Sequence, residues 1–152
     1  FNSMRFLENN AMPAVLRGLE KSGRQRTDFI LQINAIVITG ETEEAISAAT
    51  ESVKGLLGFY ASTPAYRPPM EAVGYEDLQP ELNALSKQGK WDALGSYIDD
   101  DFLEHFTTRG APSEIAAKLK DKYGQYADRL AIYAPYAAPD DMWRKIIAEL
   151  KN

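Results

Sequence analysis

The sequence predicts an α/β fold that is mostly helical, with two parallel strands separated by a helical insertion. One observation is a helix pattern over residues 112–124 that leads into a short apolar run at 130–134. A second is the apolar run 30–38, which precedes another helix pattern at 42–60. A third is the stretch 62–109, which contains four prolines and gives no strand signal. Helices that alternate with buried strands are typical of α/β folds.

The last helix–strand unit is the clearest. Pro112 suits the first helical position, where its missing N–H loses no hydrogen bond. Ile115, Leu119 and Tyr123 recur every four residues and form one apolar stripe. We expect Gly124 to cap this helix in the left-handed conformation. The apolar run that follows lacks alternation, so it predicts a strand buried on both faces, as in parallel sheets.

The N-terminal part predicts a helix over residues 4–22. Ser3 can cap this helix and Gly23 can end it. Pro13 lies inside the pattern and removes a backbone donor, so we expect a kink or a split there.

The run 30–38 is the strongest strand signal, because it is rich in β-branched residues. Thr39 and Gly40 turn the chain, and acidic residues then favour the N-terminus of the helix 42–60. This helix stops before Pro64.

Residues 62–109 predict a helical insertion made of short amphipathic pieces, near 77–88, 91–98 and 102–106. If both strands run in the same direction, the helix 42–60 after the first strand and the helix 112–124 before the second must both run in the opposite direction. The insertion must therefore cross back over the sheet, and the piece near 77–88 can do so. A final helix is expected over 139–150.

Composition limits the classes of function. The chain has 152 residues, of which 45% are hydrophobic, enough for one core of ordinary size. The net charge of -5 and the absence of a basic run argue against nucleic acid as a partner. There is no apolar run long enough for a membrane span, and no cysteine for a disulfide or a thiolate ligand. We expect a cytoplasmic protein that does not bind the membrane.

Two other features have a structural explanation and a functional one. His105 is the only histidine and could act as a general base, but a place on a helix surface is the stronger interpretation. Asp99, Asp100 and Asp101 lack the alternating spacing of a calcium loop, so they indicate a solvated helix start and no metal site.

Two motifs carry a family resemblance. Residues 110–119 read Gly-x-Pro-x-Glu-Ile-Ala-x-Lys-Leu, and residues 123–129 read Tyr-Gly-x-x-x-Asp-Arg before an apolar strand. Together they resemble the last helix–strand unit of luciferase-like monooxygenases, and more narrowly the branch that uses the deazaflavin coenzyme F-420. Residues 63–68 resemble the same branch. Ala111 departs from the pattern, where Thr or Ser often caps the helix.

The resemblance implies that residues 1–152 form the C-terminal part of a (β/α)8 TIM barrel, which usually needs about 250 residues. It implies an oxidoreductase that transfers hydride between coenzyme F-420, or FMN, and a small organic substrate. In that family most groups that hold the coenzyme lie before the sixth strand. We therefore expect this chain alone to be inactive, and no catalytic or cofactor-binding residue is assigned to it.

In a barrel, function gathers at the C-terminal ends of the strands and in the loops that follow them. The insertion leaves from one of these ends and could act as a lid. Within it, Tyr66 could stack on a ring and Arg67 could bind a carboxylate or phosphate, although a stiff surface turn is the simpler interpretation. Tyr133 and Tyr136 border the end of the last strand and could line a cavity or simply pack.

A second class of function is a non-catalytic helical module that binds a ligand or another protein. The two classes differ in what precedes the chain, because only the oxidoreductase requires further βα units. Two strands cannot close a barrel, and bare strand edges favour pairing with another chain. We therefore expect a homodimer or a higher homo-oligomer.

Overall fold

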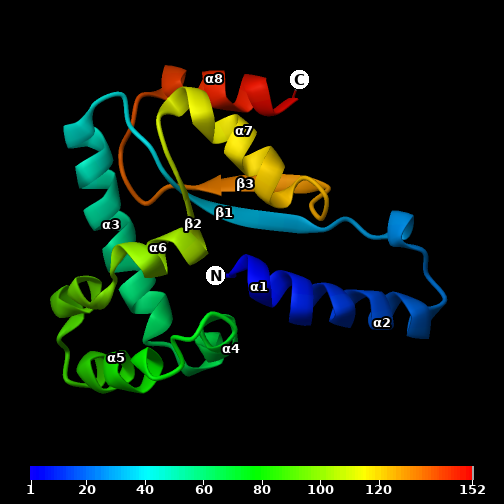
Figure 1. Cartoon of the computed structure of the whole chain (residues 1–152), viewed down its shortest axis with the longest axis horizontal. Coiled ribbons are helices and arrows are strands. Elements are labelled where there is room, and N and C mark those ends of the chain that lie inside the picture. Colours follow the sequence, from blue (N-terminus) through cyan, green and yellow to red (C-terminus); the bar gives the residue numbers. More distant parts are fainter. Residues whose placement is uncertain (152) are drawn as a thin grey trace.

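The computed structural model describes residues 1–151 and confirms a mostly helical α/β fold (Figure 1). The chain forms, in order, α1 (Met4–Phe6), α2 (Met12–Ser22), β1 (Gln32–Ile38), α3 (Glu43–Ala61), α4 (Arg67–Glu71), α5 (Leu78–Lys87), α6 (Asp100–Phe106), β2 (Thr107–Arg109), α7 (Pro112–Tyr123), β3 (Arg129–Tyr133) and α8 (Asp140–Lys151). Short 3₁₀ segments lie at Arg26–Asp28, Pro64–Tyr66 and Trp91–Tyr97. None of the helices within this part of the chain has the length and apolarity that a membrane crossing requires.

The sheet has three parallel strands in the order β2-β1-β3. The expected parallel pairing of β1 with β3 is confirmed, in a register that aligns Gln32 with Arg129. The expectation of only two strands is wrong, because β2 pairs with the C-terminal half of β1 and aligns Ile36 with Thr107. β2 lies in the stretch that gives no strand signal. Its three residues directly follow the apolar pattern of α6, so it is too short and too polar to show an apolar run.

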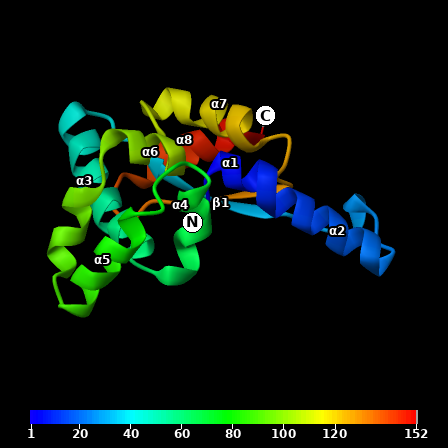
Figure 2. The ribbon, with the colours of Figure 1, turned by 60° about the horizontal axis from the view of Figure 1, so that its bottom comes forward.

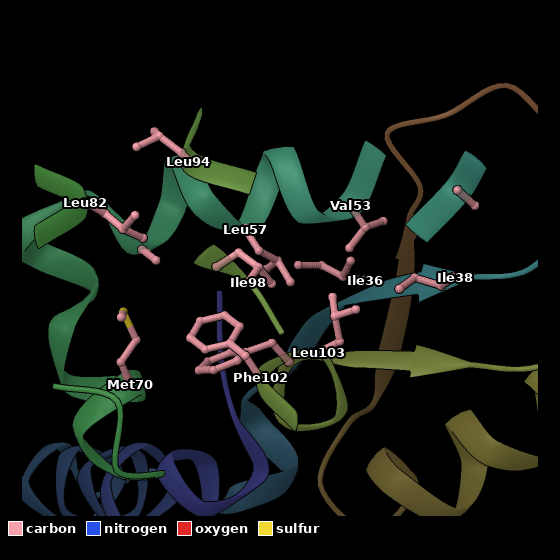
Figure 3. Packing of buried hydrophobic residues seen from close by; sticks show 13 residues of the cluster. Ile36, Ile38, Val53, Leu57, Met70, Leu82, Leu94, Ile98, Phe102 and Leu103 are labelled. Carbon is pink, nitrogen blue, oxygen red and sulfur yellow. The ribbon is translucent and has the colours of Figure 1, made fainter. Parts of the chain in front are cut away.

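Helices cover both faces of β1. Ile36 and Ile38 point toward α3 and α6 and join a core with Val53, Leu57 and Leu103 (Figure 3). The alternate side chains of β1 pack against α7, α8 and the N-terminal helix; that second cluster comprises Leu7, Ile33, Ala35, Val37, Ile115, Leu119, Tyr123, Met142 and Ile146. In a complete (β/α)8 barrel consecutive strands are neighbours. Here β3 lies beside β1 instead of β2, and the sheet is open.

The N-terminal helix is continuous but changes its winding, as Pro13 suggested. Ser3 caps α1 and accepts a hydrogen bond from the Phe6 N–H. Residues Leu7–Ala11 then form a π-helical turn, in which the Met12 N–H reaches back to the Leu7 carbonyl. This wider turn gives room ahead of the proline ring, and the α-helix resumes at Met12. The end of α2 extends away from the rest of the molecule (Figures 1 and 2).

Two expectations about the last helix–strand unit are corrected. Gly124 is right-handed, with φ of -59°, because the chain continues into a turn whose Ala127 N–H bonds to the Tyr123 carbonyl. β3 is only half-buried, with its three central residues partly exposed. It pairs with β1 on one side, and no strand of the described residues lies on its other side.

The insertion packs closely on α3. The 3₁₀ segment Trp91–Tyr97 runs against this helix at Gly58, where an added Cβ would lie 2.6 Å from the backbone carbon of Leu94. Gly58 allows two backbones to approach, which buries Leu94 and Ile98 in the core.

Candidate functional site

The loop after β3 is fastened to the end of β1 by Tyr136. Its hydroxyl donates a hydrogen bond to the Val37 carbonyl at 2.9 Å and accepts one from the Thr39 N–H at 3.0 Å. Burial raises the pKa of Tyr136, while the bond from Thr39 lowers it. Both of the hydroxyl's hydrogen-bonding roles are thus used within the chain. Tyr136 therefore links the loop after β3 to the end of β1, and its hydroxyl is not free to bind a ligand.

A hollow lies on the α3 side of the sheet, across β1 and β3. It has a volume of about 390 Å³ and is lined by Phe1, Asn34, Ile36, Tyr60, Ala131, Ile132 and Tyr133. Three of its lining side chains are aromatic rings. The Asn34 side chain is the one amide among the lining residues, and it can both donate and accept a hydrogen bond.

Tyr60 stands at the centre of this aromatic group. Its ring lies edge-on to those of Phe1 and Tyr66, with centroids 5.8 and 5.6 Å away. Burial raises the pKa of Tyr60, and the neighbouring Tyr133 hydroxyl raises it further. The group can receive a flat ring by stacking or edge contact and can offer it phenol hydroxyls.

The structure thus brings two of the four predicted site residues to one group. Tyr66 contacts the hollow's rim through Phe1 and Tyr60, and Tyr133 lines the hollow itself. Arg67 begins α4 and is exposed; within residues 1–151 its guanidinium makes no ion pair. Its role as a ligand-binding residue stays a prediction.

Sequence reasoning missed Phe1 and Tyr60 as parts of this group. Tyr60 fits the apolar stripe of its helix, so its pattern is the same as that of a core residue. Phe1 is brought in by stacking on Phe106, with ring centroids 4.4 Å apart. No spacing rule connects residues so far apart along the chain.

The acidic run Asp99–Asp101 lies at the start of α6 and also anchors the insertion. Asp99 caps α6 by accepting a hydrogen bond from the Phe102 N–H at 2.7 Å. The Tyr75 hydroxyl donates to Asp101 at 2.7 Å and lies 3.2 Å from Asp99, and burial together with these carboxylates raises the Tyr75 pKa. His105 is half-exposed on α6, with its Nε2 3.9 Å from Asp101. These contacts explain Asp99, Asp101 and His105 as structural residues.

Comparison with known proteins identifies the family of the chain. A family model described as luciferase-like monooxygenase matches residues 8–129. Uncharacterized proteins of Mycobacterium bovis and of two Mycobacterium tuberculosis strains are 41% identical to the chain over 128 residues. The match covers 84% of this chain but 38% of each relative, so the chain spans well under half of their length. The family match spans most of the chain, including both helix–strand motifs that first suggested it. The chain belongs to the luciferase-like monooxygenase family.

Proposed function

We propose that this chain is part of an oxidoreductase that transfers hydride between a deazaflavin or flavin and a small organic substrate. The observation that carries the proposal is the family match over residues 8–129. The coenzyme, F-420 or FMN, would supply the hydride chemistry, and the protein would supply orientation and a dry pocket.

The aromatic hollow is the part of this chain that suits such a role. Its rings provide a surface for a planar group, and the Asn34 amide can hydrogen-bond the polar edge of that group. None of its lining side chains is a cation that could bind a phosphate. The residues present therefore fit the ring portion of the coenzyme and leave its phosphate to other parts of a longer protein.

Because residues that would bind the coenzyme's phosphate are expected outside this chain, we predict weak cofactor binding by the 152-residue chain. Titration with coenzyme F-420 and with FMN, followed by ligand fluorescence, should show no submicromolar binding. The full-length Mycobacterium tuberculosis relative serves as the comparison and should bind one of the two coenzymes. Submicromolar binding by this chain alone would show that the main site lies within it. Failure of the longer relative to bind either coenzyme would contradict the proposed chemistry and favour a non-catalytic module.

Arg67 tests whether the insertion contributes to binding. In a full-length protein that carries this segment, Arg67→Ala should weaken substrate or cofactor binding about tenfold to a hundredfold, because a bidentate charged contact is lost. Arg17→Ala is the matched control, since Arg17 is also exposed but lies on α2. Unchanged kinetic constants for Arg67→Ala would leave this residue as part of a surface turn.

We also propose that two copies of this chain pair through β3. The outer edge of β2 is covered, because the Lys122 and Lys118 ammonium groups bond to the carbonyls of Thr107 and Arg109. Among the side-chain hydrogen bonds of the described residues, none covers the outer edge of β3 in this way. A bare edge favours addition of another strand, and a two-fold axis would satisfy both copies at once. Light scattering at micromolar concentration tests this pairing, and a clean monomer would contradict it.

A further inference from the structure

A hollow of about 350 Å³ lies beyond the C-terminal ends of β1 and β3. It is lined by residues 39–42, which follow β1, and by residues 136–139, which follow β3. The rest of its wall comes from one residue of α8 and three of α3: Met142, Ala45, Ala48 and Ala49. It shares no lining residue with the aromatic hollow, and the proposed oxidoreductase function gives it no role.

The strand order makes this end of the sheet a favourable place for a ligand. β1 and β3 are parallel neighbours. The helix that follows β1, α3, packs on one face of the sheet, and the helix that follows β3, α8, packs on the other face. The two loops therefore separate as they leave the strands, and a crevice opens between them. In open α/β sheets, ligands bind in such crevices outside the carboxyl ends of the strands.

Two polar side chains that line this hollow have no partner within residues 1–151. Thr39 is buried, with 1% of its surface exposed, and its hydroxyl makes no hydrogen bond. A buried polar group left in this way costs stability, and a bound molecule can satisfy it. Glu41 is exposed, and none of the ion pairs in the described part of the chain includes it. Lys145 shares a smaller hollow with Glu41 but forms no ion pair with it.

The charges around the hollow favour a cation as its ligand. Glu41 is the one carboxylate among the lining side chains, and none of these side chains is a cation. The first turns of α3 and α8 add four more carboxylates close to the loops that form the hollow. A helix N-terminus by itself favours an anion. At the start of α3, however, Glu44 already supplies one: its own backbone N–H and then the Thr42 hydroxyl lower the pKa of its carboxyl.

We propose that this hollow binds a small organic amine in its charged form, a primary ammonium group on a short apolar chain. An ammonium group has three donors, which suit the unpartnered Thr39 hydroxyl oxygen and the Glu41 carboxylate. The apolar chain suits the alanine side chains of α3 and the Met142 side chain. The volume of about 350 Å³ lies at the lower end of ligand pockets, so the ligand is small.

Butylammonium is the probe that tests this site, with butanol and butyrate as matched neutral and anionic probes. Each is titrated into the ¹⁵N-labelled chain, and the backbone amide signals are followed by NMR. Butylammonium should shift the signals of Gly40, Ala45 and Ala138 in a saturable way, with a dissociation constant of about 1–10 mM, as expected for so small a ligand. Butanol should bind at least about threefold more weakly, because it gains no ion pair with Glu41, and butyrate should not shift these signals.

Variants separate a built site from the general attraction of an acidic protein for cations. Glu41→Gln and Thr39→Val should each weaken butylammonium binding about threefold to tenfold, whereas Thr39→Ser keeps the hydroxyl and should bind nearly as the wild type does. Glu104→Gln is the matched control, since Glu104 is also exposed but lies on α6, and it should leave the affinity unchanged. Equal binding of the three probes, no saturable shift at the hollow, or equal losses for Glu41→Gln and Glu104→Gln would overturn the proposal.

Discussion

β2 and β3 flank the same central strand, but they are buried to different extents. Thr107 and Thr108 of β2 keep only 4% and 5% of their surface exposed. The three central residues of β3, Leu-Ala-Ile, are only partly buried, and Tyr133 at its end is 42% exposed. The polar strand is thus the buried one, and the apolar strand is the open one.

The difference arises from what lies next to each strand. α6 and α7 contact β2, and lysine side chains cover its outer carbonyls. β3 packs chiefly against β1, and its hydrophobic side chains line surface hollows. Burial of a short strand is therefore set by its neighbours, and its composition is a poor guide to it.

The largest expected effect comes from placing the same charge in both strands. Thr108→Asp puts a carboxylate at a buried position, and should lower the free energy of unfolding by more than about 3 kcal/mol. Ala131→Asp puts it in the half-buried strand, and should cost about 1 kcal/mol, because water still reaches the site. Urea denaturation measures both values. Equal losses would show that the two strands do not differ as described.

A smaller effect is expected at the contact that holds the insertion over the α3 side of β1. Gly58→Ala forces a methyl group against the Leu94 backbone and should destabilise the protein by about 1–3 kcal/mol. Gly55→Ala is the matched control on the same helix, since its Cβ would meet nothing within 4 Å. This control should be neutral or gain about 0.5–1 kcal/mol of helix stability. Similar values for both variants would contradict the close backbone contact.

The lysine cover of β2 predicts a dependence on alkaline pH. Lys122 has a folded-state pKa of about 8, against 10.5 as its ordinary value. Between these values the unfolded chain binds more protons, so the contribution of Lys122 to stability rises with pH across that window. Lys122→Met should remove this rise. It should also stabilise the protein at neutral pH by about 1–2 kcal/mol, because the gain from no longer burying a charged amine exceeds the cost of the lost hydrogen bond to Thr107. Thermal melts at several pH values compare the two proteins.

The smallest effect is expected where β3 begins. The Asp128 carboxylate accepts a hydrogen bond from the Leu31 N–H at 2.7 Å and pairs with Arg26 at 2.8 Å. These contacts, the Leu31 bond first, lower the Asp128 pKa below 3.8. Its stabilising contribution is present above the unfolded pKa and is lost as the pH falls through the folded one. Asp128→Asn should therefore melt slightly below the wild type at neutral pH and together with it in strong acid. A constant difference at all pH values would exclude this contact as the cause.

Much of the fold could be predicted from periodic patterns. The helix stripe of Ile115, Leu119 and Tyr123 is buried as expected, and the run 30–38 became the central strand. Pro13 marked the change of winding in the first helix. In each case a local pattern and the tertiary packing favour the same structure.

The missed features depend on contacts between distant residues. β2 has three residues and forms only because β1 offers it a partner. The strand order cannot be read from the chain, since either side of β1 accepts the apolar run of β3. The aromatic group of Phe1, Tyr60 and Tyr66 likewise assembles from α3, the 3₁₀ segment Pro64–Tyr66 and the chain's first residue. Arg67 had a clear chemical interpretation, but its surroundings could not be predicted.

The strand order has a consequence for how the chain is made. β1 is complete after residue 38, but its partners come from residues 107–109 and 129–133. Both of its partners in this sheet are therefore made after it, and β3 only after α7 has been made. Contacts this far apart along the sequence slow folding and leave unpaired edges exposed to other chains in the meantime. Of the three strands described here, the central one is thus made before either of its partners.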